Sequence, residues 1–272
     1  MKLARRTLFA VAIVSCFGLA ACGQKSAQQS ASPSDGSAPA AAAEAKEIIV
    51  GSDASYRPFE YQNDQKEVVG FDVEVLTAAA QKSGLKVKFV NTPWEGIFQA
   101  LQNGDRDILA SAITITEERR KSMDFSDPYF DARQLIAVGK GVTNVKSFDD
   151  LKDKKVAVQT GTTGDEVVQK LLGKTSPNIK RFESMPLALK ELENGGVQAA
   201  VGDNGVVVNY VQNNPGNGIV TVEDTKSFVA EQYGFAVKKG NQALLDKVNS
   251  GLKAIKADGT YDNIYKKYFG SK

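Results

Sequence analysis

The sequence predicts an α/β protein made of two lobes of similar construction. Short apolar runs that suit buried strands alternate with segments whose apolar residues recur at helical spacing, a pattern typical of βαβ units. The same alternation begins again after Val138 and predicts a second α/β lobe. The chain leaves the first lobe near residues 129–133 and returns near residues 231–234, so we expect two crossing segments that form a hinge.

In the first lobe, strands are expected where apolar residues form short runs, and helices where they line one face. The expected strands are 47–51, 86–90 and 108–110. A helix should follow Gly70, with Asp72 as its N-cap and Gly84 just past its end. Another is expected over Trp94–Gln102, because Ile97 and Leu101 share its inner face.

The second lobe and the tail show the same signals. The expected strands are 156–158, 199–201 and 233–237, and the expected helices are 148–151, 162–172, 186–193, one beginning at 206–211, and 242–257. The longest of these has an apolar stripe of Leu245, Val248, Leu252 and Ile255. Gly259 should end it, and Thr260 should cap the final helix.

The segment before the first strand is predicted to lie outside the folded body. Three basic residues precede an apolar run over residues 8–21, which is short for a membrane span and suits a signal peptide. The run ends in Leu-Ala-Ala-Cys, which resembles a bacterial lipobox, so residues 1–21 are interpreted as a lipoprotein signal peptide and Cys22 as the lipidated residue. An ordinary signal peptide that contains a cysteine is the alternative. Residues 22–46, rich in Gln, Ser, Ala, Pro and Gly, are predicted to be a flexible tether.

Composition excludes several classes of function. The 272 residues include 34 Lys plus Arg, 32 Asp plus Glu and no histidine, which excludes a Ser-His-Asp triad and a His-ligated metal. A net charge of +2 gives no basic footprint for nucleic acid. Removal of residues 1–21 takes away Lys2, Arg5 and Arg6 and no acid, which leaves a nearly neutral body. Cys16 would be cleaved off and Cys22 acylated, so neither a disulfide nor a cysteine nucleophile is expected.

Three polar segments follow predicted strands and could converge on a small zwitterion. Residues 111–119 lead into a helix that Thr116 would cap, and the Arg119 guanidinium suits bidentate capture of a carboxylate. Residues 159–164 form a glycine-containing turn whose N–H groups could face an anion. Asp203, at a strand end, could pair with an ammonium. Each has an ordinary alternative: a solvated helix face, a simple turn and a helix cap, respectively.

Several segments closely resemble the polar amino-acid solute-binding proteins of ABC importers, family 3 of the bacterial solute-binding proteins. The resemblance covers residues 47–270. It rests on GSDASYRPFEY (51–61), VGFDVEVLTAA (69–79), PWEGIFQALQNG (93–104), ASAITITEERRKSMDFSDPYF (110–130), VQTGTTGDE (158–166) and NSGLKAIKADGTYDNIYKKYFG (249–270). It implies the type II periplasmic-binding-protein fold, in which two lobes joined by two crossing hinge strands close on one amino acid. The implied lobes are 47–130 with 233–272, and 131–232.

The resemblance also implies a role for each matching position. Arg119 would hold the ligand α-carboxylate, assisted by the backbone N–H groups of Thr114 and Thr163. The Thr114 hydroxyl, the Ala112 carbonyl and Asp203 would hold the α-ammonium. Side-chain pocket residues would be Asp53, Tyr56 and Trp94 from the first lobe and Gln159 and Thr162 from the second. The sequence departs from some relatives at Gln159 and Ala112, and Gln159 leaves the exact ligand open.

A basic amino acid, arginine, lysine or histidine, is the expected ligand. Asp53 and Glu60 flanked by aromatic side chains would favour a cation through charge pairing and cation–π contact, with Glu60 as a solvated loop charge the alternative. Glutamine is the nearest rival ligand. A periplasmic cyclohexadienyl dehydratase, and an adhesin or sensor module, are alternatives of other classes.

The expected protein is a binding protein and not an enzyme. It needs no cofactor and no metal, works as a monomer and passes its ligand to the membrane subunits of an ABC permease. It is exported and held by its lipid on a bacterial membrane, facing the periplasm or the cell exterior.

Overall fold

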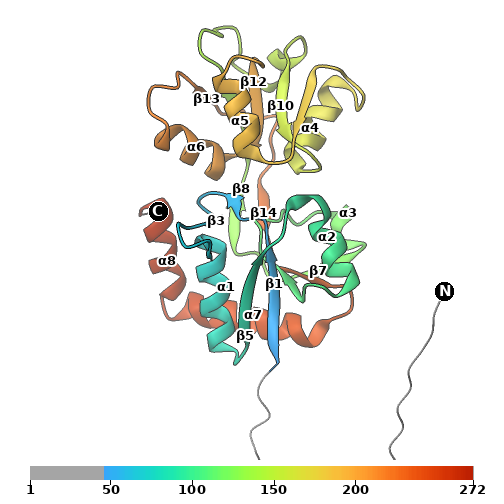
Figure 1. Cartoon of the computed structure of the whole chain (residues 1–272), viewed down its shortest axis with the longest axis vertical. Helices are drawn as coiled ribbons and strands as arrows, with labels where there is room; N and C mark the ends of the chain where they lie inside the picture. The colour runs from blue at the N-terminus through green and yellow to red at the C-terminus, as the bar shows by residue number, and fades with distance from the viewer. Residues whose placement is uncertain (1–45, 272) are drawn as a thin grey trace, which may run out of the picture. The chain divides into compact units, whose positions relative to one another are not determined.

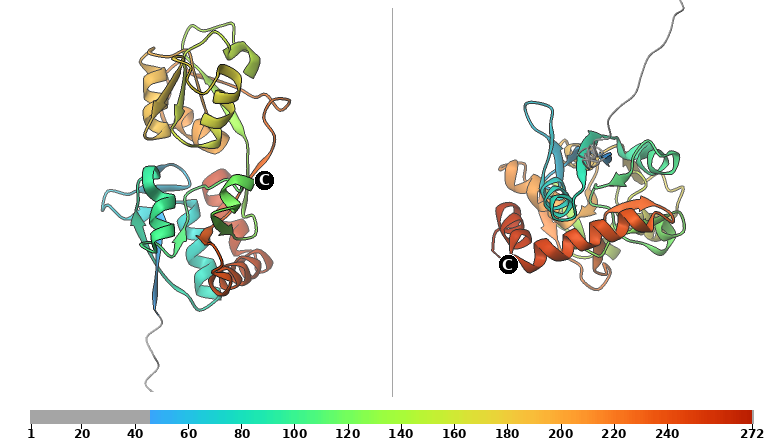
Figure 2. Two further views of the ribbon diagram at one scale, coloured as in Figure 1. Left: turned by 90° about the vertical axis from the view of Figure 1, so that its right-hand side faces the viewer. Right: turned by 90° about the horizontal axis from the view of Figure 1, so that it is seen from below.

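Two five-stranded sheets form the centres of two lobes, joined by a pair of strands that run between them (Figures 1 and 2). The structure is a computed structural model that describes residues 46–271. The predicted signal peptide 1–21, the lipidated Cys22 and nearly all of the tether lie outside the described residues. None of the described helices has the length and apolar character that crossing a bilayer requires.

The first lobe contains the sheet β5-β1-β6-β15-β7. Its strands are β1 (Glu47–Ser52), β5 (Lys86–Asn91), β6 (Ile108–Leu109), β7 (Met123–Phe125) and β15 (Ala236–Lys238). β5 and β6 pair in parallel with β1, whereas β15 is antiparallel to both of its neighbours. The helices of this lobe are α1 (Phe71–Lys82), α2 (Trp94–Asn103), α3 (Glu117–Arg120), α7 (Gln242–Ala257) and α8 (Thr260–Phe269). A small antiparallel sheet of β2 (Ser55–Tyr56), β3 (Glu60–Gln62) and β4 (Val68–Val69) lies before α1.

The second lobe contains the sheet β11-β10-β12-β9-β13. Its strands are β9 (Gln134–Val138), β10 (Val156–Gln159), β11 (Ile179–Phe182), β12 (Ala199–Asp203) and β13 (Val220–Val222). β10 is parallel to both of its neighbours, and β9 is antiparallel to both of its own. The helices are the short 3₁₀ helix η1 (Phe148–Leu151), α4 (Thr163–Leu172), α5 (Met185–Glu193) and α6 (Asn204–Asn213).

The two crossing segments expected from the sequence are present as strands. β8 (Phe130–Ala132) and β14 (Glu231–Tyr233) pair in antiparallel fashion, with Glu231 opposite Ala132. Figure 1 shows both strands between the lobes. They bring the segments that enter and leave the second lobe side by side, which is the geometry of a hinge. The prediction of a type II fold with two lobes and two hinge strands is confirmed.

An aromatic cluster fills the first lobe next to the hinge. Phe59 is fully buried and makes edge-on ring contacts with Phe71, Phe130 and Tyr233. Such edge-on pairs contribute about 0.5–1.5 kcal/mol beyond their buried area. Gly70 permits this packing, because its φ of 138° and a distance of 2.2 Å from an added Cβ to the Phe59 carbonyl oxygen both exclude a side chain.

Three local predictions are wrong. Asp72 does not cap α1: the cap position is Gly70, and the fully buried Asp72 carboxylate instead accepts hydrogen bonds from Ala112 N and Tyr129 Oη. Thr260 is the first residue of α8, and the left-handed Gly259 occupies its cap. The expected strand 233–237 is broken into β14 and β15, because the backbone between them turns from the hinge into the sheet.

Candidate functional site

A cavity of about 310 Å³ lies between the two lobes. Most of its residues come from the carboxyl ends of β1, β6, β10 and β12 and from the starts of α2 and α4, the edge where ligands bind in open α/β sheets. Tyr56, Glu60 and Arg119 are added by β2, β3 and α3. Twelve residues line it: Asp53, Tyr56, Glu60, Trp94, Ser111, Ala112, Thr114, Arg119, Gln159, Thr162, Thr163 and Asp203. All ten site residues nominated from the sequence are brought together here, and the structure adds Glu60 and Ser111.

The lobes touch each other across this cavity. Tyr56 Oη, from the first lobe, donates to Asp203 Oδ2, from the second, at 2.9 Å. Gln159 Nε2 and Asp53 Oδ2 lie 3.4 Å apart across the same gap. The cleft is therefore closed in this structure, and side chains from both lobes complete one another's hydrogen bonds.

A larger hollow of about 1170 Å³ lies beside the hinge, between β8 and the α7–α8 region. It is open to the surface, and none of the ten nominated residues lines it. The cleft cavity, where a guanidinium and several carboxylates converge, is the better candidate site despite its smaller volume.

The Arg119 guanidinium is fixed in place from several sides. Thr116 caps α3, as predicted, by accepting from Arg119 N at 3.1 Å. Arg119 Nη1 donates to the Thr114 carbonyl at 2.9 Å, and the guanidinium carbon lies 5.5 and 5.2 Å from the ring centroids of Trp94 and Phe98. Burial lowers the pKa of Arg119 from its usual value, although the side chain remains charged at any physiological pH. A guanidinium held in this way is preorganised for bidentate binding of a carboxylate.

Asp203 lies at the end of β12 and is buried among hydrogen-bond donors. Tyr56 Oη and Tyr233 Oη both donate to Oδ2, and Gln134 Nε2 lies 2.6 Å from Oδ1. Burial raises the pKa of Asp203, while these donors and Arg119 act in the opposite direction. Its side chain does not cap α6, so the alternative of a simple helix cap does not hold.

Ala112 has a left-handed backbone, with φ of 45°, which is uncommon for a residue that carries a Cβ. Its N–H donates to Asp72 Oδ2 at 2.8 Å, and this bond holds the strained turn that follows β6. Asp72 therefore fixes the backbone at a position where the carbonyl was expected to contact the ligand.

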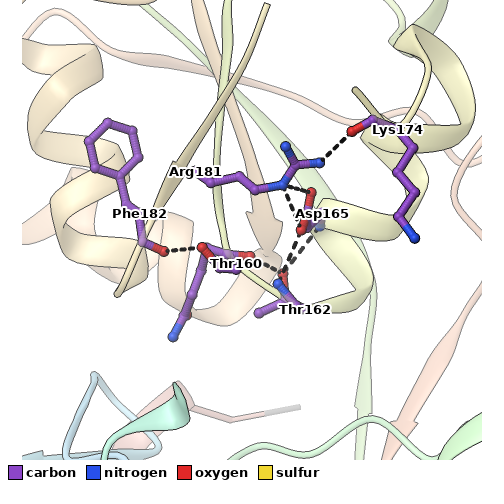
Figure 3. Close-up of polar contacts among 8 residues, drawn as sticks. Thr160, Thr162, Asp165, Lys174, Arg181 and Phe182 are labelled. Carbon is purple, nitrogen blue, oxygen red and sulfur yellow. Dashed lines mark hydrogen bonds and ion pairs between the residues drawn. The ribbon is translucent and has the colours of Figure 1, made fainter. Parts of the chain in front are cut away.

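The glycine turn of the second lobe is held by an ion pair between the buried Asp165 and the partly exposed Arg181 (Figure 3). Thr162 Oγ1 caps α4 by accepting from Asp165 N at 3.2 Å, and Asp165 Oδ2 accepts from Gly161 N at 3.1 Å. Arg181 Nε donates to both Asp165 oxygens, at 3.0 and 3.1 Å. The N-terminus of α4, with Thr163 in its first turn, is thereby aimed at the cavity, where its dipole favours an anion.

Carboxyl groups gather on the first-lobe side of the cavity. Asp53 N donates to Ser111 Oγ, which donates in turn to the fully buried Glu60 Oε1 at 3.1 Å. Burial and the neighbouring carboxylates Asp72 and Asp53 raise the pKa of Glu60 well above its usual value. Burial raises the pKa of Asp72 to about 7, and burial raises that of Asp53 as well. A bound cation would favour the ionised form of these carboxyls, so this wall suits a positively charged side chain.

The residues that sequence reasoning missed are polar groups whose burial depends on the tertiary fold. Glu60 was expected beside the side-chain pocket, with a solvated loop charge as the alternative, and was left out of the nominated set, although it is 0 % exposed. Ser111 precedes the nominated Ala112 and was passed over, although it shares the strand-end position that identified its neighbours. Gln134 and Glu231, which contact Asp203, Thr114 and Thr163, lie on segments next to the hinge and carry no local signal. No cluster of three or more metal-ligating side chains occurs in residues 46–271.

Comparison with known proteins gives consistent matches over the folded body. The model of the bacterial extracellular solute-binding proteins, family 3, matches residues 48–271. A probable histidine-binding protein of Neisseria gonorrhoeae is 45% identical over 97% of this chain and 96% of its own length. The ABC transporter arginine-binding protein 1 of Escherichia coli is 33% identical over 84% of this chain and 93% of its own. The solved arginine-, lysine-, histidine-binding protein ArtJ of Geobacillus stearothermophilus superposes with a TM-score of 0.80 at 44% identity, over 84% and 96% of the two chains.

Proposed function

Because the chain belongs to family 3 of the bacterial extracellular solute-binding proteins, we propose that it binds one L-amino acid with a basic side chain between its lobes. Family membership implies a location outside the cytoplasm. After the lobes close, the protein delivers the ligand to the membrane subunits of an ABC permease. The observation that supports this proposal most strongly is that a fixed guanidinium, Arg119, and a buried carboxylate, Asp203, line one cavity of small volume.

In the proposed complex the two ends of the amino acid are bound by different groups. Arg119 and the backbone N–H groups of Thr114 and Thr163 hold the α-carboxylate, while Asp203, the Thr114 hydroxyl and the Ala112 carbonyl hold the α-ammonium. Charge-assisted hydrogen bonds contribute about 1.5–3 kcal/mol each. Four or five of them, after the cost of closure, are consistent with a Kd of about 1 μM.

The preference for a basic side chain follows from the carboxyl-rich wall. Asp53 and Glu60 lie beside the aromatic walls of Tyr56 and Trp94, which suits a guanidinium, an ammonium or an imidazolium. Gln159 Nε2 and Ser111 Oγ add neutral polar contacts, so glutamine is the rival ligand. The names of the similar proteins, histidine-binding and arginine-binding, agree with the basic class.

A thermal-shift screen with the common amino acids tests this proposal. A ligand present at 100 times its Kd adds about 2.7 kcal/mol of stability, so arginine, lysine or histidine should raise the melting temperature by several degrees. Calorimetry on the ligands that raise it then gives the order of affinity. Tight binding of glutamine with no binding of arginine, lysine or histidine would overturn the preference, and no response to any amino acid would overturn the proposal.

We also propose that the protein is a binding protein without catalytic activity. The alternative on the same fold is a dehydratase that acts on cyclohexadienyl acids, using an acidic group as the proton donor. A complete set of groups for both ends of an amino acid favours capture and release. Turnover of prephenate or arogenate by the purified protein would contradict this.

Residues 1–46 are proposed to export and anchor the protein. In this proposal residues 1–21 are a lipoprotein signal peptide, Cys22 carries the lipid, and residues 22–46 are the tether. Cys22→Ala should release the protein from the membrane fraction, whereas the matched change Cys16→Ala, inside the signal peptide, should leave it attached. Membrane attachment of Cys22→Ala would rule out the lipid anchor.

The expected division into lobes, 47–130 with 233–272 and 131–232, and the monomeric state remain predictions. Hydrogen exchange should show two protected blocks that meet near the hinge. Light scattering should give the mass of one chain.

A further inference from the structure

Glu231 lies behind the cavity, on hinge strand β14, and does not line the cavity itself. Its Oε2 accepts from Thr114 Oγ1 of the first lobe at 2.8 Å and from Thr163 Oγ1 of the second lobe at 2.9 Å. Gln134 Nε2 lies 3.3 Å from both of its carboxylate oxygens. One carboxylate on the hinge thus bonds to a threonine hydroxyl from each lobe.

These bonds determine which way the two hydroxyl groups point. A threonine hydroxyl has one O–H to donate and two lone pairs that accept. An ionised carboxylate can only accept, so Thr114 and Thr163 must donate to it. Both threonines line the cavity, and neither hydroxyl has a proton left for an acceptor. Thr114 Oγ1 keeps both lone pairs for a donor, and Thr163 Oγ1 keeps one, because Gln134 Nε2 donates to it at 3.1 Å.

The proposed ammonium subsite needs such acceptors. Asp203 already accepts from Tyr56, Tyr233 and Gln134, which occupies about three of the four acceptor positions of its carboxylate. An ammonium group has three N–H donors, and Asp203 can take about one of them. The other donors are left for the Ala112 carbonyl and for neutral hydroxyl oxygens whose own protons point away.

We propose that Glu231 is a positioning residue that makes the Thr114 and Thr163 hydroxyls acceptors for the ligand's α-ammonium group. This inference rests on the proposed function, because it assumes that the ligand is an amino acid. Glu231 acts through the two threonines and has no contact with the ligand. Through the two threonines Glu231 also sets the ligand's orientation. If the ligand bound in the reverse direction, its carboxylate would lie next to two hydroxyls that cannot donate a hydrogen bond to it.

The test compares two ligands that differ only in the amino group: L-arginine and 5-guanidinopentanoic acid, its counterpart without the α-amino group. L-histidine and 3-(imidazol-4-yl)propionic acid form a second pair. Calorimetry measures the affinity of each for the unaltered protein and for Glu231→Gln, which keeps the shape but can donate from its amide. We expect Glu231→Gln to weaken binding of the amino acid by about tenfold or more, which corresponds to the loss of a charge-assisted hydrogen bond. Binding of the deamino ligand should weaken by less than about threefold.

The matched control is Glu223→Gln, the same change of charge at an exposed residue eight positions earlier, which should leave all affinities unchanged. Equal losses for the amino acid and its deamino counterpart, or no loss for either, would overturn the role of Glu231. Failure of the unaltered protein to bind any amino acid would instead overturn the proposed function, and this inference with it.

A double-mutant cycle keeps the proposal testable if the deamino ligands bind too weakly to measure. If Glu231 acts through the Thr114 hydroxyl, Glu231→Gln should cost less amino-acid affinity in a Thr114→Val background than alone. Additive losses would show that Glu231 does not act through Thr114. Thermal melts of each variant identify any that fail to fold.

Discussion

The two lobes contribute to the cavity unequally. The first lobe supplies eight of the twelve lining residues, including Arg119, and the second supplies four, including Asp203. In the first lobe the guanidinium is held by a carbonyl and two aromatic rings, whereas in the second the turn before α4 is held by the ion pair Asp165–Arg181. From this difference we propose an order of events in which the ligand docks on the first lobe and the second lobe then closes over it.

The largest loss of ligand affinity is expected from removing the Arg119 guanidinium, the first lobe's proposed partner for the ligand carboxylate. Arg119→Ala should weaken amino-acid binding by about hundredfold or more, since it removes charge-assisted hydrogen bonds to the carboxylate. The next residue, Arg120, is exposed and provides the control. Calorimetry should find Arg120→Ala close to the unaltered protein. Equal affinities of the two variants would mean that the first lobe does not anchor the ligand through Arg119.

A smaller loss of ligand affinity is expected from weakening the Asp165–Arg181 ion pair, which holds the turn before α4 in the second lobe. The Asp165 side chain is only 3% exposed, and its partner Arg181 is 30% exposed. Asp165→Asn therefore weakens an ion pair that is buried on the carboxylate side, and it loosens the turn at Gly161. We expect a loss of about 1–3 kcal/mol in the free energy of unfolding and roughly tenfold weaker binding. Asp149→Asn, which changes an exposed pair in the same lobe, is the control. Unchanged binding in Asp165→Asn would show that the turn does not depend on this pair.

Closure itself can be impaired without changing any polar group. Gly205, on α6 of the second lobe, approaches the first lobe so closely that an added Cβ would lie 2.8 Å from the Phe59 ring. Phe59 is fully buried and cannot give way easily. Gly205→Ala should therefore weaken binding by about tenfold, chiefly by disfavouring the closed form. Small-angle scattering should show a less compact liganded state, and the exposed Val208→Ala should behave as the unaltered protein. Full closure of Gly205→Ala would contradict this contact.

The two lobes should also differ in how pH affects their stability. In the first lobe the pKa of Asp72 is raised to about 7, so the folded state binds a proton that the unfolded state has released above about pH 4. This contribution favours folding at low pH and is lost as pH rises toward 7. In the second lobe hydrogen bonds from Phe148 N and Ser227 lower the pKa of Asp224 to about 2, so its contribution is present above pH 4 and lost as pH falls toward 2.

Urea unfolding measured across the pH range separates these contributions. Asp72→Asn should flatten the fall in the free energy of unfolding as pH rises from about 4 to 7. Asp224→Asn should flatten the fall in the same quantity as pH drops from about 4 toward 2. The expected result is that the Asp72 contribution to stability falls with rising pH and the Asp224 contribution rises with it. A pH profile that Asp72→Asn leaves unchanged would mean that this carboxyl is ionised throughout.

Much of the fold could be predicted because it depends on local signals. The helix 242–257 and the short helix 148–151 agree with α7 and η1 residue for residue, since each has a continuous apolar stripe or a capping sequence. The left-handed Gly84 past the end of α1 was predicted for the same reason. The broken strand at 233–237 was not, because apolar residues continue through a turn that only the hinge requires.

The site divides in the same way. Arg119, the turn at residues 159–164 and Asp203 could be put forward from their positions after predicted strands, and the resemblance supplied the remaining positions and the individual roles. The burial of Asp72 and Glu60 could not be predicted from local sequence, because a carboxyl group is buried beside another only when the fold supplies donors such as Ala112 N and Ser111 Oγ. Glu231 is 117 residues from Thr114 and 68 from Thr163, so only the folded hinge brings them together.

The most direct test of the account is a crystal structure of the protein with the amino acid that gives the largest thermal shift. We expect closed lobes, the ligand α-carboxylate on Arg119 and the N–H groups of Thr114 and Thr163, and the ammonium on Asp203. A ligand bound in the reverse direction, or outside the cavity between the lobes, would contradict it.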